Sequence, residues 1–163
     1  MKQLLTTSGD KVMVSDKDFK KVSSYRWSTL KSKNHSLLYA RRTFCNGVSR
    51  KHVFLHRFIL GITDPKVKVD HRDRNGLNCT RKNLRTCTHS QNLYNSKLRV
   101  NNTSGFKGVS WNKWHKAWMV KIRSQNNYVF LGYFGSRVTG AKVYDRAARK
   151  LFGRFARTNF SRS

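Results

Sequence analysis

A carboxylate and an imidazole are neighbours in the polar stretch VDHRDRNGLNCTRKNLR, residues 69–85. Asp70 is one of only seven acidic residues in a chain with thirty-five lysines and arginines, and His71 follows it directly. Carboxylate and carboxamide oxygens are hard ligands that suit Mg²⁺, which keeps several waters and takes phosphate oxygens. A neutral histidine can accept a proton from water near physiological pH. These residue types indicate hydrolysis of a phosphate ester. The alternative is that Asp70 is a turn residue and His71 a surface residue, with no role in chemistry.

Local elements must bring these side chains together. The alternating segment KVKVDH (residues 66–71) predicts a strand that ends at His71, and LRTCT (residues 84–88) predicts a second short strand. Thr88, followed three residues later by Gln91, fits a capping box, which places Asn92 one turn into a helix. A strand, a loop, a strand and a capped helix would bring Asp70 and His71 close to Asn92.

The charge of the whole chain indicates a polyanionic partner. The formal net charge is +28, the sequence pI is about 11.1, and no acidic residue occurs from Arg74 to Tyr144. Positive charge that displaces condensed counterions binds nucleic acid without regard to sequence, so double-stranded DNA is the expected partner. An anionic membrane surface is the alternative, but no long amphipathic or apolar segment supports it, so no membrane association is expected. No obligatory protein partner is evident.

The start of the chain and its cysteines predict where the protein works. MKQLLTTSGDK lacks the apolar core of a signal peptide, so we expect an intracellular, cytoplasmic protein that is not secreted. Cys45, Cys79 and Cys87 form no CxxC pair. No structural zinc site is therefore expected, and the cysteines are interpreted as small buried hydrophobes.

The pattern along the chain predicts an α+β protein with separate modules. Residues 1–50 read as strands and turns, a strand-rich region that would support the next module. Residues 51–98 would form that module; within it, Gly61 would end a short apolar helix, and His56 is expected to be a packed core histidine. The polar segment RVNNTSG (residues 99–105) is the predicted linker. Residues 106–163 show three strand-like runs and then a helical pattern that Ser136 can begin and Gly153 can end.

The order and spacing of the candidate residues resemble those of the HNH nuclease family. Asn83 comes thirteen residues after Asp70 and Asn92 comes twenty-two after it. Within the family, the pattern looks like that of phage and intron-encoded homing endonucleases, in which the third histidine of the name is replaced by asparagine. The resemblance extends from LHRFILG (residues 55–61) to about Ser96.

This resemblance implies a ββα-metal fold that hydrolyses DNA phosphodiesters with one divalent metal ion, Mg²⁺ or Mn²⁺. His71 would be the general base that activates the attacking water. Asp70 and Asn92 would hold the metal, which stabilises the pentacovalent phosphorus and the departing 3′-oxygen. Asn83, also a predicted catalytic residue, would brace the loop by side-chain hydrogen bonds and so help to orient His71.

The last third of the chain resembles the Apetala-two (ethylene-response-factor) DNA-binding domain. The matching text is GFKGVSWNK, AWMVKIR, FLGYF, GAKVYDRAARKLFG and TNF, within Ser104 to Phe160. In that family a three-stranded sheet packs on a helix, and its outer face enters the major groove. The predicted DNA-binding residues are Lys107, Trp111, Lys113, Lys121, Arg123 and Phe130, with Trp111 open to either backbone stacking or core packing. Ser110 and Tyr128 stand where plant members usually have Arg, so the base preference does not carry over.

The sequence therefore predicts an α+β chain in which a ββα-metal nuclease module precedes a three-stranded antiparallel sheet packed on one helix. The predicted function is a metal-dependent DNA endonuclease, of a homing or mobile-element type, that nicks or cuts both strands. A DNA-binding regulator with an inactive nuclease module is the alternative. A basic RNA- or ribosome-binding protein would explain the charge but not the spacing.

Overall fold

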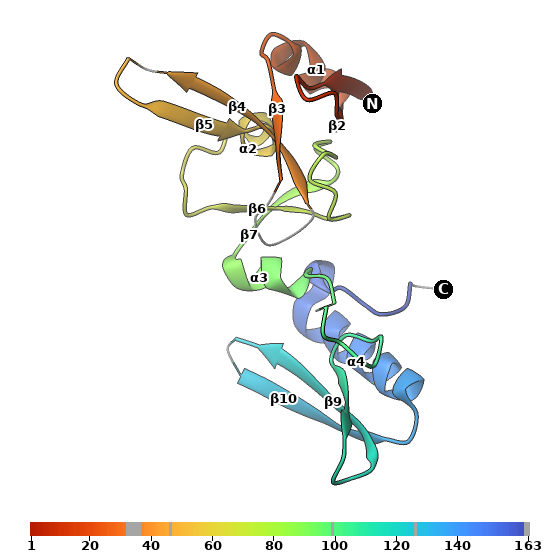
Figure 1. Ribbon diagram of the computed structural model, residues 1–163. Coiled ribbons are helices and arrows are strands. Elements are labelled where there is room, and N and C mark those ends of the chain that lie inside the picture. Colours follow the sequence, from red (N-terminus) through yellow and green to blue (C-terminus); the bar gives the residue numbers. More distant parts are fainter. Residues whose placement is uncertain (32–36, 46, 99, 126, 162–163) are drawn as a thin grey trace. The chain divides into compact units, whose positions relative to one another are not determined.

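Helices and antiparallel sheets share the chain, as the α+β prediction requires (Figure 1). The computed structural model describes residues 1–31, 37–45, 47–98, 100–125 and 127–161. It divides into two units, a first unit of residues 1–88 and a second unit of residues 89–163. Each unit has its own hydrophobic core. No helix within the described ranges is both long and apolar enough to span a bilayer.

The described residues of the first unit form three antiparallel sheets and two helices. In chain order its elements are β1 (Lys2–Leu5), β2 (Lys11–Val14), α1 (Asp16–Ser23), β3 (Ser28–Lys31), β4 (Leu38–Cys45), β5 (Arg50–Phe54), α2 (Leu55–Leu60), β6 (Lys68–His71) and β7 (Leu84–Cys87). The sheets pair β1 with β2, β3 with β4 and β5, and β6 with β7. As predicted, Gly61 ends α2 in the left-handed conformation.

Helix α1 was not predicted, because residues 1–50 were expected to hold strands and turns alone. Asp16 and Asp18 lie in its first turn and Lys20 and Lys21 in its last, the charge order that a helix dipole favours. Val22 is fully buried in the core of the first unit. Only eight residues long, the helix depends on this tertiary burial rather than on a periodic sequence signal.

Residues 1–50 are built into the same core as the predicted nuclease hairpin. Buried members of that core include Val12, Trp27, Leu55 and Leu84. Main-chain hydrogen bonds join β2 to the loop before β7: Met13 N donates to Leu77 O at 2.9 Å, and Cys79 N donates to Met13 O at 2.8 Å. The N-terminal strands therefore hold one side of the loop that follows His71.

The second unit contains one sheet and one long helix. Its elements are α3 (His89–Tyr94), β8 (Val109–Asn112), β9 (Ala117–Ser124), β10 (Asn127–Phe134), α4 (Arg137–Phe152) and the 3₁₀ helix η1 (Gly153–Phe155). The strand order is β10-β9-β8, all antiparallel, and α4 packs on this sheet (Figure 1). The Ser136 side chain accepts a hydrogen bond from Val138 N and caps α4, and Gly153 follows its end. The predicted three-stranded sheet on one helix is thus confirmed.

The division between the units falls earlier than the predicted linker. Helix α3 and the residues after it belong to the second unit, whereas the linker was placed at residues 99–105, of which residue 99 lies outside the described ranges. The predicted module boundaries stay a prediction. Cys79 and Cys87 are buried as expected, but Cys45 is exposed at the end of β4, so the burial expected of that cysteine was wrong.

Candidate active site and DNA-binding face

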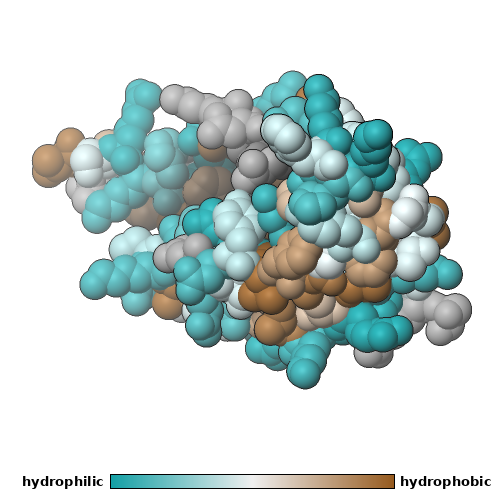
Figure 2. Space-filling view, turned by 90° about the horizontal axis from the view of Figure 1, so that it is seen from below, coloured by the Kyte–Doolittle hydropathy of each residue, from teal (hydrophilic) through white to brown (hydrophobic). Residues whose placement is uncertain are grey.

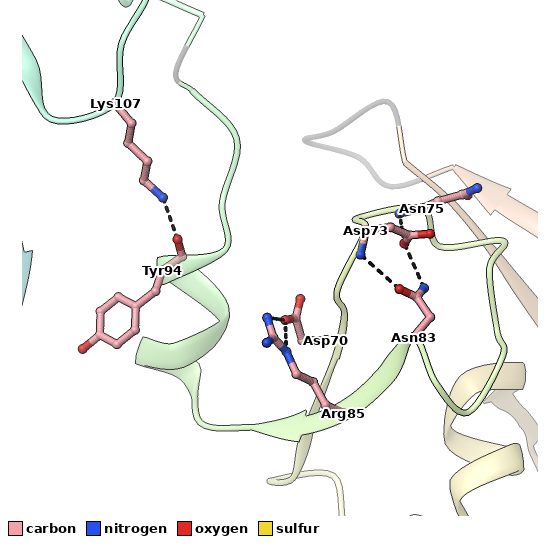
Figure 3. A network of polar contacts seen from close by, with 7 residues as sticks. All are labelled: Asp70, Asp73, Asn75, Asn83, Arg85, Tyr94 and Lys107. Carbon is pink, nitrogen blue, oxygen red and sulfur yellow. Dashed lines mark hydrogen bonds and ion pairs between the residues drawn. The ribbon is translucent and has the colours of Figure 1, made fainter. Parts of the chain in front are cut away.

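The hairpin of β6 and β7 carries the Asp70–His71 step. Its register pairs Asp70 with Arg85 and His71 with Leu84. Because neighbouring residues of a strand point to opposite faces, Asp70 and His71 leave β6 on different sides. Asp70 and Arg85 face each other across the hairpin, where Arg85 Nε donates to Asp70 Oδ2 at 2.8 Å (Figure 3). Both side chains are buried, so Asp70 is half of a buried ion pair that the sequence analysis missed.

His71 lies in a ring of aromatic and thiol groups within the first unit. Its ring centroid is 5.0 Å from that of His56 and 5.8 Å from that of Tyr39, and its Nε2 is 3.9 Å from Cys79 Sγ. The residue is only 5% exposed. Burial lowers the pKa of His71 below its usual 6.5, even though the Asp73 and Asp70 carboxylates act in the opposite direction. The imidazole is therefore neutral at pH 7 and able to accept a proton.

The neighbours of His71 are not competing acids or nucleophiles. Burial, together with His71 and Arg57, lowers the pKa of His56 to about 3, so this ring is also neutral. Its Nδ1 is buried and has no hydrogen-bond partner within the described part of the chain. Burial raises the pKa of the Cys79 thiol to about 12, which keeps it protonated and unreactive. The role of His71 as the general base stays a prediction.

Asn83 ties together the loop between β6 and β7. Its Oδ1 accepts a hydrogen bond from Asp73 N at 3.0 Å, and its Nδ2 donates to Asp73 Oδ1 at 2.8 Å (Figure 3). The same Nδ2 also donates to Asn78 O at 2.8 Å. Asn83 O accepts the N–H of Arg72, the residue next to His71. These bonds fix the backbone that leaves His71. The catalytic role expected of Asn83 stays a prediction.

Asp73 acts as a turn residue. Its carboxylate accepts hydrogen bonds from Asn75 N and from the side chains of Asn78 and Asn83. Burial tends to raise the pKa of Asp73, but these hydrogen bonds outweigh it and hold the pKa below its usual value. The carboxylate is committed to the loop.

The predicted metal ligands fit a hard divalent cation in their donor chemistry. Arg85 Nε and Nη2 donate to Asp70 Oδ2, and the oxygens of a carboxylate are ligands that a hard cation such as Mg²⁺ prefers. Among the described residues, no group of three His, Cys, Asp or Glu side chains gathers as a preformed metal site would. A metal bound to Asp70 would therefore take other oxygen ligands, as Mg²⁺ does from water and phosphate. Asn92 lies exposed on α3 in the second unit, and its role as a ligand stays a prediction.

The outer face of the sheet in the second unit carries cations and aromatic rings. Lys121 and Arg123 are exposed on β9, and both lie within 6 Å of the Tyr128 ring on β10, at 5.5 and 5.8 Å. Phe130 pairs with Lys121 across the strands and is 55% exposed. Lys113 is exposed in the turn between β8 and β9. These side chains form a basic, aromatic surface of the kind that contacts DNA phosphates and bases.

Two predicted DNA-binding residues have other contacts. Trp111 pairs with Trp118, on the side of the sheet that carries Val120, and the two rings meet edge to face at 5.1 Å. Trp111 is nevertheless 46% exposed and is not part of the core of the second unit, so its contact with DNA stays a prediction. Lys107 Nζ donates to Tyr94 O at 2.6 Å (Figure 3). It also donates to Ser96 O at 3.1 Å. Its expected contact with DNA stays a prediction.

The surface combines charge with exposed apolar groups. Figure 2 shows one face on which hydrophilic residues cover most of the area and surround a group of hydrophobic ones. Trp114, next to Lys113, is 96% exposed. Isolated aromatic side chains among cations suit nucleic acid, because bases stack on rings while phosphates meet the cations.

A buried Asp–His step on a β-hairpin, in a chain of net charge +28, fits a hydrolase that acts on nucleic acid. A family model described as HNH endonuclease matches residues 50–94. The chain belongs to the HNH endonuclease family, enzymes that cleave DNA and generally depend on a divalent metal. The match covers both strands of the hairpin and the whole of α3.

Viral relatives extend the similarity beyond this match. Protein 3.8 of Escherichia phage T7 is 32% identical over 108 residues, which cover 66% of this chain and 88% of the relative. The uncharacterized HNH endonuclease L560 of Acanthamoeba polyphaga mimivirus is 32% identical over 139 residues, covering 85% of this chain and 68% of the relative. Dehydration-responsive element-binding protein 2A of Arabidopsis thaliana is 38% identical over 65 residues, which cover 39% of this chain but only 19% of that protein.

Proposed function

We propose that the protein is a divalent-metal-dependent DNA endonuclease of the homing or mobile-element type, in which the second unit binds the duplex. The observation that carries the catalytic part is the neutral, buried His71 at the end of β6, inside the segment that matches the family model. A base held neutral at pH 7 beside a carboxylate is what activation of water requires.

In the proposed reaction His71 takes one proton from the attacking water while the water oxygen bonds to phosphorus. The phosphorus–O3′ bond breaks, which leaves a 5′-phosphate and a 3′-hydroxyl once the departing oxygen gains a proton from solvent. Asn83 holds the loop so that the imidazole stays in place. Asp70 and Asn92 would hold one Mg²⁺ or Mn²⁺ ion, which offsets the negative charge that develops on the phosphate.

Recognition is assigned to the basic sheet face of the second unit. Its similarity to a protein named as binding a dehydration-responsive element supports this proposal, and so do the exposed Lys121, Arg123 and Phe130. Since counterion release makes such binding independent of sequence, base contacts must supply any site preference. The cytoplasmic location expected from the sequence stays a prediction.

The homing type is tested by the length of the preferred site. The full chain is incubated with Mg²⁺ and phage genomic DNA, and the cut ends are sequenced. We expect a few sites that share a sequence too long to recur by chance. Cut ends that share no common sequence would contradict a homing function and would indicate a nonspecific nuclease.

The pH dependence of cleavage follows from His71. Burial lowers the pKa of His71, so kcat/KM should rise with pH to a plateau, with the midpoint of the rise below pH 6.5. The measurement is kcat/KM on a short duplex between pH 4.5 and 8 at saturating Mg²⁺. A midpoint at or above 6.5 would contradict the assignment of His71 as the free base.

Folding must be controlled in this experiment. A histidine with a lowered folded-state pKa binds a proton more readily when unfolded, so His71 and His56 both make the folded state less stable as the pH falls below 6.5. Cleavage rates are therefore compared only at pH values where the circular dichroism spectrum of the protein matches its spectrum at pH 7.

A further inference from the structure

Helix α3 carries Asn92, yet it has little stability of its own. It is six residues long, and none of its residues is buried. Isolated helices of this length do not persist in water, so contacts from outside must hold α3 in place. Because α3 is grouped with the second unit, those contacts are found there.

Two contacts fasten the end of α3 to the second unit. The Tyr94 ring stacks on the Phe152 ring of α4, with centroids 3.7 Å apart and planes 11° from parallel. The ammonium of Lys107 donates to the carbonyl oxygen of Tyr94 (Figure 3) and to that of Ser96. A cation at the last carbonyls of a helix is also favoured by the helix dipole.

The backbone of Lys107 is itself anchored in the core of the second unit. Its N–H donates to Asn159 Oδ1 at 2.6 Å, and its carbonyl accepts from Asn159 Nδ2 at 3.2 Å. Asn159 in turn donates twice to Asp145 Oδ1, and Asp145 is only 1% exposed. Gly108 lets this loop lie against α4, because a Cβ there would stand 2.0 Å from the Tyr144 ring. The lysine therefore reaches α3 from a rigid base.

The same region of the second unit holds a cavity next to the DNA-binding face. Its volume is about 420 Å³, and it is lined by Leu93 and Tyr94 of α3 and by Lys121, Arg123 and Tyr128 of the sheet, among others. A nucleic-acid phosphate held by those sheet cations would lie against α3. Helix α3 and the basic sheet face therefore line the same cavity.

We propose that Lys107 is a positioning residue for Asn92, which it serves by fastening α3 to the DNA-binding unit. This inference rests on the proposed function, in which Asn92 is a metal ligand. It follows that the second unit both binds DNA with its sheet and places Asn92 for the metal. Lys107 then affects metal use, whereas a lysine that only contacted phosphate would affect DNA affinity.

The test uses the full chain with Lys107→Met and Tyr94→Leu, and with Lys142→Met as a matched control. Lys142 is an exposed lysine of α4 outside the cavity, so its loss removes the same charge. Hydrogen exchange of amides 92–96 is measured without metal or DNA. The Mg²⁺ concentration for half-maximal cleavage and the affinity for duplex DNA in EDTA are measured beside it.

We expect Lys107→Met and Tyr94→Leu to speed exchange of these amides by roughly tenfold or more, because charge-assisted hydrogen bonds or a ring contact are lost. The Mg²⁺ midpoint should rise by about tenfold, the usual effect of losing a group that orients a ligand. Lys142→Met should change neither quantity.

Two results would overturn the inference. If Lys107→Met weakens DNA binding but leaves the exchange and the Mg²⁺ midpoint unchanged, Lys107 is a phosphate contact. An unchanged midpoint in Tyr94→Leu with faster exchange would mean that the position of α3 does not matter for metal use. Absence of cleavage by the unsubstituted chain would remove the proposed function instead, and with it the positioning role.

Discussion

His71→Ala should lose nearly all DNA cleavage while it still binds DNA. General-base catalysis contributes about 10²- to 10⁴-fold to a rate. The described neighbours of His71 offer no second base, because burial lowers the pKa of His56 to about 3 and raises the pKa of Cys79 to about 12. The base acts only in the transition state, so the loss falls on kcat rather than on affinity. Single-turnover cleavage of a short duplex with Mg²⁺ measures the first quantity, and a gel-shift titration in EDTA measures the second.

The matched control is His52→Ala. His52 is exposed on β5 of the same unit, where its Nδ1 pairs with Thr43 Oγ1. This variant should cleave at the unsubstituted rate. Full activity in His71→Ala would remove His71 from the mechanism, whereas equal losses in both variants would show a general effect of removing histidine.

Arg85→Met should destabilise the first unit by about 3–5 kcal/mol, because it leaves the Asp70 carboxylate buried without its partner. That loss is a large share of the stability of a small domain. Asp70→Asn in the same chain should restore most of it, since no buried charge then remains. Urea dependence of hydrogen exchange in peptides from residues 1–88 reports on this unit alone.

Arg26→Met provides the control for this pair, because Arg26 is exposed in the same unit. It should change stability little. The double variant should also lack cleavage, since the proposed metal ligand is gone. If Arg85→Met is as stable as the unsubstituted chain, Asp70 does not depend on Arg85, and the pair is weaker than its burial implies.

Much of the fold was predictable because local signals agreed with it. Alternation predicted β6 up to His71, Gly61 ended α2, and Ser136 and Gly153 bounded α4. Helix α1 was missed because it is short, and its helical state depends on burial of Val22 against distant strands. Because that contact joins residues far apart in the sequence, a local sequence pattern cannot predict it.

The candidate site was predictable as a set of residues but not as a set of contacts. The spacing of Asp70, His71 and Asn83 indicated the loop, yet the partner of Asp70 depends on the hairpin register that places Arg85 opposite it. Once β6 and β7 were predicted, that register was a signal that could have been used. Lys107 was interpreted as a DNA contact because it falls where the Apetala-two family places such residues. Its hydrogen bonds to the carbonyl oxygens of Tyr94 and Ser96 follow only from tertiary packing.

Metal-dependent hydrolysis is the central claim, and one plasmid experiment tests it most directly. Supercoiled plasmid is incubated with the purified full chain, in parallel with Mg²⁺ and with excess EDTA, and the products are separated on an agarose gel. The proposed function predicts nicked or linear DNA with Mg²⁺ and unchanged supercoiled DNA with EDTA. Plasmid that stays supercoiled with Mg²⁺, or that is cut equally well in EDTA, would contradict it.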